Sequence, residues 1–285
     1  MINVNRVAKK ISWLTSQPEF QAHPFNVSMR LVQWEWCRLK GKPVVMPLYD
    51  FKLKARPCDG VGRVLFYFRE HGDDLFGFME KYLKPGMTFV DVGANIGSHT
   101  LHASRLVGRT GKVFSIEADP KTFDLLQRNI RSNGVTNAHL LNRCVSDKKA
   151  EVLFNVDSNS ARSSLVRQGA SQINLHADCL DDLLPSGLPV DLLKIDVEGA
   201  ELLVLKGAAR VFRDAPPRVV VFEASSNQSA IQGFLVSHGY RLYKFDRSNA
   251  CLREVASPVF NTYAIRNLDG FEISALKICT SGAAE

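Results

Sequence analysis

The stretch FVDVGANIGSHT, Phe89–Thr100, decides the fold of this 285-residue chain. The apolar run that ends at Val92 predicts a buried strand, and the segment from Ser98 onward predicts a helix. Between them, Gly93 and Gly97 bracket a short loop, in which glycine permits positive φ and close approach of a ligand. The stretch therefore predicts a strand, a ligand-facing loop and a helix whose first turn offers free N–H groups.

Strand-like and helix-like segments alternate from this stretch to the end of the chain. We predict strands at Thr88–Val92, Lys112–Ile116, His139–Val145, Asp191–Asp196, Val219–Glu223, Arg241–Phe245 and Val259–Ile265. We predict helices at Ser98–Val107, Pro120–Asn133, Ala200–Phe212 and Gln228–His238. Such alternation predicts an α/β fold with a doubly wound, mostly parallel, seven-stranded sheet. Almost no helix separates the last two strands, so we expect the last strand to be antiparallel.

Residues 150–182 interrupt the alternation. EVLFNV and INLHADCL predict two additional strands around the polar loop DSNSARSS, where a helix would be expected. His176 lies in the second of these strands, and its place in the alternation points it toward the ligand site. A lone histidine in a strand is more often structural.

The N-terminal part differs in pattern and in charge. Residues 1–42 predict helices, and VVMPLYDFKLKARP with RVLFYF predicts short strands around the turn CDGVG. We therefore expect an N-terminal helical and β-hairpin extension over residues 1–84 and a larger domain over 85–285. Residues 1–85 hold 14 Lys and Arg against 8 Asp and Glu, whereas the other 200 residues hold 22 against 21. The excess predicts a solvated basic face, or contact with an anionic surface.

One predicted N-terminal helix carries an apolar stripe. Met29, Val32, Trp36 and Leu39 recur at spacings of 3, 4 and 3 residues. The stripe favours a helix docked on its own core. Two tryptophans beside basic residues also fit a helix on a membrane surface, so peripheral membrane contact stays open.

The cysteines and the termini indicate the compartment. None of the six cysteines forms a C-x-x-C pair or zinc-site spacing, so we expect free thiols and a reducing environment. Residues 1–20 lack the apolar segment of a secretory signal, and no apolar run approaches the roughly 18 residues of a membrane helix. We expect a cytoplasmic protein without a transmembrane segment.

Two acids at strand ends indicate the ligand. A dinucleotide site requires G-x-G-x-x-G facing a pyrophosphate, which a carboxylate at Asp91 would repel. Glu117, 24 residues after Gly93, ends the second strand, where a carboxylate accepts both ribose hydroxyls. A ribose without phosphate, joined to a cationic amino-acid group, describes S-adenosylmethionine (SAM).

A second stretch, DLLKIDVEGAE at 191–201, places charges at the end of another buried strand. Lys194, Asp196 and Glu198 lie in its last half, although burial of an unpaired charge is costly. Parallel strands bring this end beside the first loop, which favours a functional role. A structural ion pair of Lys194 with Asp196 or Glu198 is the alternative.

Together, FVDVGANIGSHT, VFSIEADPKTFDLLQRNIRSN and LLKIDVEGAELLVLKGA resemble the FkbM-type family of SAM-dependent methyltransferases, from about Val61 to Arg266. The resemblance implies a class I methyltransferase (Rossmann-like) fold, SAM as cofactor and O-methylation. It also implies that CLDDLL, with Asp181, and SSL, at 163–165, belong to the family pattern. The cofactor-binding residues it implies are Asp91, Gly93, Ala94, Asn95, Gly97, Glu117, Ala118, Asp119, Val145 and Ser146. Two departures are Ala118-Asp119 before Pro120, where the family has proline after the glutamate, and His99 in place of an aromatic residue.

Methyl transfer to an alcohol needs alignment of the reactants and removal of a proton. We hypothesise that Asp196 or Glu198 is the base, with Glu223 at the end of the next strand as a secondary candidate. Two carboxylates could instead hold Mg²⁺. We expect no metal, because no third oxygen ligand is evident. The acceptor is expected to be a small molecule or glycan, and the oligomeric state is not predicted.

Two other classes of function are weighed against this one. A nicotinamide-dependent oxidoreductase fits the fold but not the loop spacing or Asp91. A non-catalytic module that binds SAM or nucleic acid would use the basic N-terminal part. Methyltransferases that act on base amines often carry an N/D-P-P-Y/F type motif where this chain has DVEG, so no nucleic acid partner is expected.

Overall fold

The computed structural model describes residues 12–69, 74–157, 163–166, 171–223, 227–266 and 276–279. The chain divides into two compact units, Met1–Asp73 and Asp74–Glu285. The division falls before α5 (Asp74–Tyr82), which we had expected in the N-terminal extension. The Tyr82 hydroxyl donates a hydrogen bond to the carbonyl of Asp191, and Phe78 is fully buried among strands of the large sheet. The helix is therefore part of the core of the larger unit.

The smaller unit packs helices on a two-stranded hairpin. Its described elements are α2 (Pro18–Ala22), α3 (Pro24–Leu39), β1 (Val44–Leu48), β2 (Phe51–Ala55) and α4 (Gly60–Phe68). β1 and β2 are antiparallel. Trp34 is fully buried, lies against the rings of Phe66 and Tyr67, and donates its indole N–H to the carbonyl of Pro57.

Two N-terminal predictions are wrong. RVLFYF is not a strand but most of α4, in which four consecutive residues, 65–68, are buried. The apolar stripe of α3 does not face a core, because Met29, Val32, Trp36 and Leu39 are all exposed, while Val27 and Trp34 on the opposite face are buried. Helix periodicity shows which residues share a face, but it cannot show which of two apolar faces is covered.

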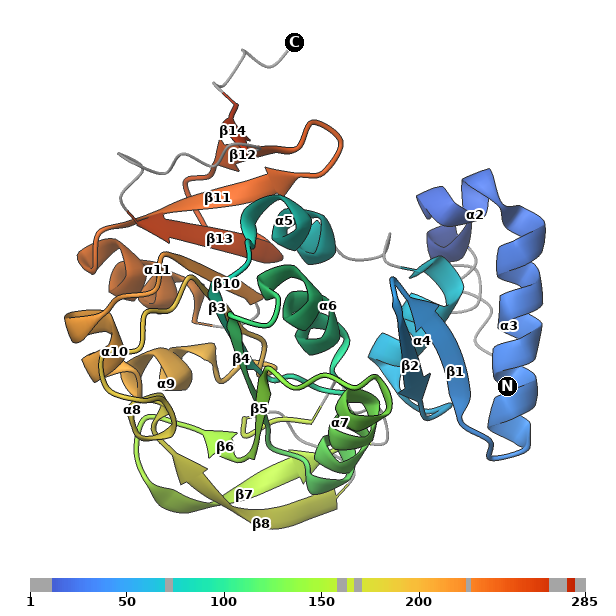
Figure 1. Cartoon of the computed structure of the whole chain (residues 1–285), viewed down its shortest axis with the longest axis horizontal. Helices are drawn as coiled ribbons and strands as arrows, with labels where there is room; N and C mark the ends of the chain where they lie inside the picture. The colour runs from blue at the N-terminus through green and yellow to red at the C-terminus, as the bar shows by residue number, and fades with distance from the viewer. Residues whose placement is uncertain are drawn as a thin grey trace. The chain divides into compact units, whose positions relative to one another are not determined.

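A nine-stranded sheet forms the centre of the larger unit (Figure 1). Its order is β14-β12-β11-β13-β10-β9-β3-β4-β5. The strands are β3 (Thr88–Val92), β4 (Lys112–Glu117), β5 (Ala138–Asn142), β9 (Leu192–Ile195), β10 (Val219–Glu223), β11 (Tyr240–Asp246), β12 (Cys251–Glu254), β13 (Asn261–Arg266) and β14 (Lys277–Ile278). The five from β5 to β10 are parallel, and β13 is antiparallel to both neighbours. The predicted α/β fold and antiparallel last strand are confirmed, and β12 and β14 extend the seven predicted strands.

Helices cover both faces of this sheet because its central strands are apolar on both sides. Phe89 packs with α5 and α6, whereas the next residue, Val90, packs on the opposite side with the helices that follow β9. Besides α5, the described helices of the larger unit are α6 (Ser98–Val107), α7 (Pro120–Ser132), α8 (Leu180–Leu183), α9 (Glu201–Lys206), α10 (Ala209–Asp214) and α11 (Gln228–Ser237). The single helix predicted over 200–212 is thus divided, since Gly207 and Ala208 separate α9 from α10.

The insertion at 150–182 forms a second, three-stranded sheet, as its two predicted strands indicated. Its order is β6 (Cys144–Val145), β8 (Ser171–Asp178), β7 (Ala150–Val156). The predicted strand over 139–145 is therefore two strands, β5 in the large sheet and β6 in the small one. The prediction for His176 is wrong, because its side chain is 80% exposed and pairs with Glu151 on the neighbouring strand.

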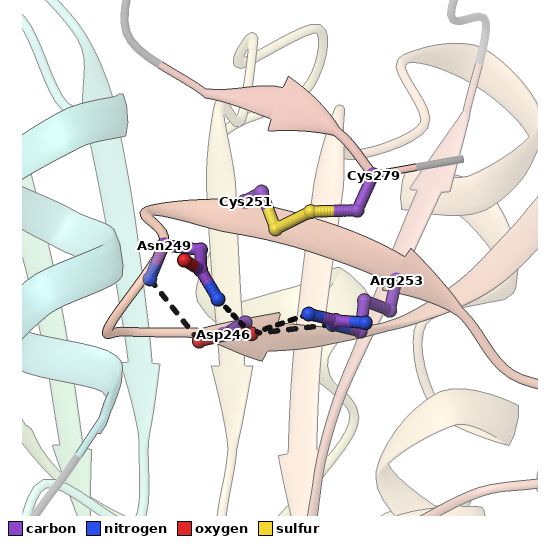
Figure 2. Close-up of a disulfide and its surroundings, with 5 residues drawn as sticks. All are labelled: Asp246, Asn249, Cys251, Arg253 and Cys279. Carbon is purple, nitrogen blue, oxygen red and sulfur yellow. Dashed lines mark hydrogen bonds and ion pairs between the residues drawn. A yellow bond between two sulfur atoms is a disulfide. The ribbon is translucent and has the colours of Figure 1, made fainter. Parts of the chain in front are cut away.

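A disulfide joins Cys251 on β12 to Cys279, just beyond β14 (Figure 2). The same edge holds Asp246, which accepts hydrogen bonds from Asn249 and Arg253. The prediction of six free thiols is wrong for these two cysteines. Cys37, Cys58, Cys144 and Cys179 are free, and of these four only Cys144 is buried. Among the described residues, no helix is long and apolar enough to cross a membrane.

Candidate functional site

Parallel pairing brings the carboxyl ends of β4, β3, β9 and β10 to one edge of the sheet. Glu117 and Glu223 are the last residues of the outer two of these four strands. The loop that begins at Gly93 follows β3, and Asp196 follows β9. Ligands of open α/β sheets bind outside this edge. The topology therefore gathers most of the predicted site residues.

Gly93 is required by contact between two loops. Its φ is +82°, and a Cβ there would lie 1.8 Å from the carbonyl oxygen of Asp196. The N–H groups of Gly93 and Ala94 both donate to the carbonyl of Ile116 on β4. Asn95 also has positive φ, and its side-chain oxygen accepts from the N–H of Ile96. The predicted loop thus fits tightly between the ends of β4 and β9.

Gly97 ends the loop and lets α6 begin. Its φ is +90°, and a Cβ there would lie 2.5 Å from a methyl group of Leu126 on α7. Because intrahelical bonding starts with the N–H of Leu101 to the carbonyl of Gly97, the first-turn N–H groups of α6 are not bonded within the helix. They give the loop a partial positive end that suits a carboxylate.

The Glu117 carboxylate is buried and held by backbone. Oε2 accepts from the N–H of Asn95 at 2.9 Å, and Oε1 accepts from the N–H of Asp119 at 2.9 Å. Burial raises the pKa of Glu117 to about 7, against the lowering effect of these two hydrogen bonds. Each oxygen keeps a lone pair for another donor. These acceptor oxygens suit a ribose diol, and the ribose contact that the sequence predicted for Glu117 stays a prediction.

Asp119 and Ala118 serve the local backbone around Glu117. Asp119 caps α7, accepting from the N–H of Lys121 and from the hydroxyl of Thr122. The carbonyl of Ala118 accepts from the side chain of Asn142 on β5. Any direct cofactor contact of these two residues stays a prediction, but their hydrogen bonds fix the direction of the chain immediately after Glu117.

Val145 and Ser146 do not end a strand of the large sheet, as had been expected. Both are buried, and the N–H of Ser146 donates to the carbonyl of Asp178 on β8. Neighbouring Cys144 nevertheless lies near Glu117: burial and then the Glu117 charge raise the pKa of this thiol to about 12. β6 also contacts β4, the strand that ends at Glu117, and the expected adenine contact of Val145 and Ser146 stays a prediction.

Lys194 links the end of β3 to Asp196 after β9. The sequence had indicated only its possible ion pair with Asp196 or Glu198. Its ammonium lies 3.1 Å from Oδ1 of Asp91, 3.1 Å from the carbonyl oxygen of Gly93 and 3.4 Å from Oδ2 of Asp196. Burial alone lowers the pKa of Lys194, but Asp91 and then Asp196 raise it, and the net pKa lies above the ordinary value. The lysine is therefore a fixed positive charge.

Asp91 is fully buried and has its partners within the protein. Besides Lys194, the hydroxyl of Thr100 donates to its Oδ2 at 2.9 Å, and the hydroxyl of Ser115 lies 2.9 Å from that of Thr100. We had expected Asp91 to face a cation on the ligand directly. In the structure, the Asp91 carboxylate contacts the Lys194 ammonium, which also contacts Asp196, so a direct contact of Asp91 with the ligand stays a prediction.

Three carboxylates form what we call the acidic cluster: Asp196, Glu198 and Glu223. Each has an oxygen within 4.8 Å of the others, and all three are half-buried. They come from the loop after β9 and from the end of β10. The structure thus brings together the three acids that the sequence analysis named as candidates for the base. It also supplies, in Glu223, the third oxygen ligand whose apparent lack had argued against a metal.

The turn that carries Glu198 is strained and held from two sides. Glu198 has a φ of +55°, which a non-glycine residue rarely adopts. Its carbonyl accepts from the hydroxyl of Ser164, which is fully buried, and the next N–H, of Gly199, donates to the side chain of Glu201. Ser164 lies in the SSL segment quoted above, but no local pattern predicts its contact 34 residues away.

Asp181, by contrast, is structural. Its two side-chain oxygens accept from the N–H groups of Arg210 and Val211 in α10. It therefore fixes α8 to α10 and lies outside the site.

The chain belongs to the methyltransferase FkbM family, because the model of the methyltransferase FkbM domain matches residues 91–247, more than half of its length. The protein named methyltransferase sdnD, of Sordaria araneosa, is 29% identical over 188 residues, which cover 53% of this chain and 72% of that protein. Methyltransferase 1 of Beauveria bassiana is 28% identical over 46% of this chain and 62% of its own length. The crystal structure of methyltransferase FkbM from Methylobacillus flagellatus has 16% identity and a TM-score of 0.46, over 72% of this chain and 55% of that one.

The protein is therefore a SAM-dependent methyltransferase with the class I, Rossmann-like fold. Its cofactor is SAM. The acceptor oxygens of Glu117 suit ribose hydroxyls, and the first-turn N–H groups of α6 suit a carboxylate. The assignment does not favour a nicotinamide-dependent oxidoreductase.

Proposed function

We propose that the protein transfers the methyl group of SAM to a hydroxyl oxygen of a small molecule or glycan, and that the acidic cluster receives this hydroxyl. The observation that carries the proposal is the position of the cluster. Asp196 is bonded through its backbone to the end of β3, and its side chain contacts Lys194, which also contacts Asp91 beneath the cofactor loop. Acceptor and cofactor would then meet at one sheet edge.

The cofactor half of the site consists of the Gly93–Gly97 loop and the Glu117 carboxylate. Glu117 would hold the ribose hydroxyls, and the first turn of α6 would hold the carboxylate of the methionine part. Val145 and Ser146 would lie toward the adenine. When bound, SAM supplies an electrophilic methyl group on a sulfonium. The chain contributes alignment of that group with the acceptor, which can account for roughly 7–11 kcal/mol of barrier lowering.

The acceptor half must remove a proton from the hydroxyl. A positioned base contributes on the order of 10²–10⁴-fold in rate. Asp196 lies 3.4 Å from the fixed charge of Lys194, so part of its charge is balanced within the protein. We propose Glu198, on the turn held by Ser164, and Glu223, at the end of the adjacent strand β10, as the candidates for the base. This refines the expectation from sequence, which had placed Asp196 and Glu198 first.

A divalent cation on the acidic cluster is the alternative chemistry. Three carboxylates with oxygens within 4.8 Å match the oxygen ligands that Mg²⁺ takes. The Lys194 ammonium, 3.4 Å from Asp196, supplies a competing positive charge. We therefore retain the metal-free mechanism, and a rate unchanged by a chelator is its expected signature.

The test is transfer from methyl-tritiated SAM to a panel of sugars and polyketide-type alcohols, with mass spectrometry of the product. Each alcohol is paired with the same compound carrying an amine in place of the hydroxyl. We expect methylated alcohol, no methylated amine, and the same rate with and without EDTA.

In Glu198→Gln/Glu223→Gln, SAM binding should persist while turnover falls by about 10²-fold or more. Glu151→Gln, an exposed acid on β7, is the matched control and should keep full activity. Full turnover in the double variant would end the proposal.

A further inference from the structure

Helix α3 carries a row of large apolar side chains on its exposed side. We call Phe25, Met29, Val32, Trp36 and Leu39 the outer stripe. Their exposed fractions are 75%, 55%, 66%, 60% and 74%. Their spacings are 4, 3, 4 and 3 residues, which places them within an arc of about 80° on a helix. Five neighbouring apolar side chains on one face differ from the scattered apolar residues that any surface carries.

The smaller unit does not need the outer stripe for its own core. The opposite face of α3 already contributes to that core through the fully buried Val27 and Trp34. On the same inner side, Arg30 donates to Glu19 and to the carbonyl of Tyr67. α3 is therefore a two-faced helix, anchored through one face and apolar on the other.

Positive charge accompanies the outer stripe. The smaller unit holds 12 Lys and Arg against 6 Asp and Glu, a net charge of +6, whereas the larger unit holds 24 against 23. At the C-terminal end of the stripe, the ammonium of Lys40 lies 5.0 Å from the ring centre of Trp36. Lys42 is exposed just beyond it. The acidic residue on this part of the helix, Glu35, is matched by Arg38 at 2.6 Å.

We propose that the outer stripe docks on an anionic lipid bilayer, with α3 lying in the plane of the interface. An apolar face with tryptophan, phenylalanine and leucine, rimmed by lysine, is the pattern of an interfacial helix. The net +6 charge complements anionic headgroups, and long lysine side chains can reach them while their stems stay over the apolar face. A second copy of the chain fits less well, because two units of charge +6 would then face each other.

Co-sedimentation of the full chain with vesicles tests the proposal. Vesicles of phosphatidylcholine containing phosphatidylserine should sediment the protein, and vesicles of phosphatidylcholine alone should sediment much less. Binding to the anionic vesicles should fall as salt rises, because screening weakens the attraction of the basic residues. Tryptophan emission should shift to shorter wavelength on binding, since Trp36 would leave water.

Two variants make the test specific to α3. Val32→Gln/Trp36→Gln/Leu39→Gln should weaken binding to anionic vesicles by about tenfold or more. Leu153→Gln/Val236→Gln removes apolar side chains of similar exposure, 56% and 53%, from the larger unit and should bind as the wild type does. Because the stripe lies outside both cores, the triple variant should keep the melting temperature and the SAM affinity of the wild type.

Three outcomes would overturn the proposal. The first is equal binding of the triple variant and the wild type. The second is absence of binding to anionic vesicles at low salt. The third is a dimer, seen by light scattering, that the triple variant dissolves while vesicles have no effect; the occupant of the stripe would then be a second copy.

Discussion

The ammonium of Lys194 lies 3.1 Å from Oδ1 of Asp91, although the two residues are 103 positions apart in the sequence. Both side chains are buried, and Lys194 also reaches Asp196 in the acidic cluster. One cation thus contacts both Asp91, at the end of β3, and Asp196, in the cluster that we propose receives the acceptor. We expect this arrangement to control both the stability of the larger unit and the charge of the site.

Removal of the cation should therefore cost more than removal of either acid. In Lys194→Met, Asp91 keeps a buried charge that still accepts a hydrogen bond from the Thr100 hydroxyl, and loss of one member of a buried pair typically costs about 3–5 kcal/mol. Asp91→Asn should cost less, because Lys194 retains Asp196 and the carbonyl of Gly93. Lys194→Met/Asp91→Asn should recover part of the loss. Urea unfolding measures the free energy of unfolding of all three variants. A value for Lys194→Met within about 1 kcal/mol of the wild-type value would contradict the assignment.

The sequence predicted the frame of this site but not its cross-links. β3 and α6 match their predicted bounds at both ends, because an apolar run and two glycines are local signals. The pairs Lys194–Asp91 and Ser164–Glu198 and the disulfide Cys251–Cys279 join residues far apart, and nothing in a local pattern specifies such partners. α4 was mistaken for a strand because its aromatic and β-branched run has high strand propensity, which tertiary packing overrides.

SAM affinity should depend on pH through Glu117. The carboxylate must be ionised to accept hydrogen bonds from both ribose hydroxyls, and burial raises its pKa to about 7. Affinity should therefore be constant above pH 7 and fall by up to about tenfold per pH unit below it. Calorimetric titration of SAM across this range measures the profile. In Glu117→Gln, affinity should be weaker and the pH dependence lost.

The same group has the opposite effect on the stability of the ligand-free protein. A raised carboxyl pKa means that the folded state holds the proton more tightly than the unfolded chain, whose ordinary value is 4.5. Protonation of Glu117 therefore contributes about 3 kcal/mol to the free energy of unfolding below pH 4.5. This contribution is lost as the pH rises from 4.5 to 7. Thermal melts of the wild type and of Glu117→Gln should diverge in slope over this interval. Identical slopes would show that Glu117 does not titrate there.

Gly93→Ala should disrupt the site, whereas another glycine should tolerate the same change. At Gly93 the new Cβ would lie 1.8 Å from the Asp196 carbonyl oxygen at a φ of +82°, so we expect a loss of more than about 2 kcal/mol and of SAM binding. At Gly233 on α11, by contrast, a Cβ would point into open space. Gly233→Ala should stabilise the protein by about 0.5–1 kcal/mol. Differential scanning calorimetry compares the two, and similar effects at both positions would argue against the loop contact.

Reduction of the Cys251–Cys279 disulfide should lower the melting temperature. Its ends are 28 residues apart. Closing a loop of that size lowers the conformational entropy of the unfolded chain, which stabilises the folded protein by about 3–4 kcal/mol. For a unit of this size the shift is on the order of 10 °C. A reductant tests this without removing the buried Cys251 side chain, and Cys37→Ser, which changes a free thiol, should respond as the wild type does. An unchanged melting temperature on reduction would contradict the bond.

The expected cytoplasmic location stays a prediction. Alkylation of free thiols before extraction shows whether the disulfide exists in the cell.

The most direct test of the site is a crystal structure with S-adenosylhomocysteine, the demethylated product of the cofactor. Two features of that structure test the assignment of the site. Both ribose hydroxyls should lie within hydrogen-bond distance of the Glu117 carboxylate, about 2.6–3.2 Å. The sulfur should face the acidic cluster of Asp196, Glu198 and Glu223. A ribose bound elsewhere, with Glu117 still occupied by backbone alone and the sulfur turned away from the cluster, would contradict the account.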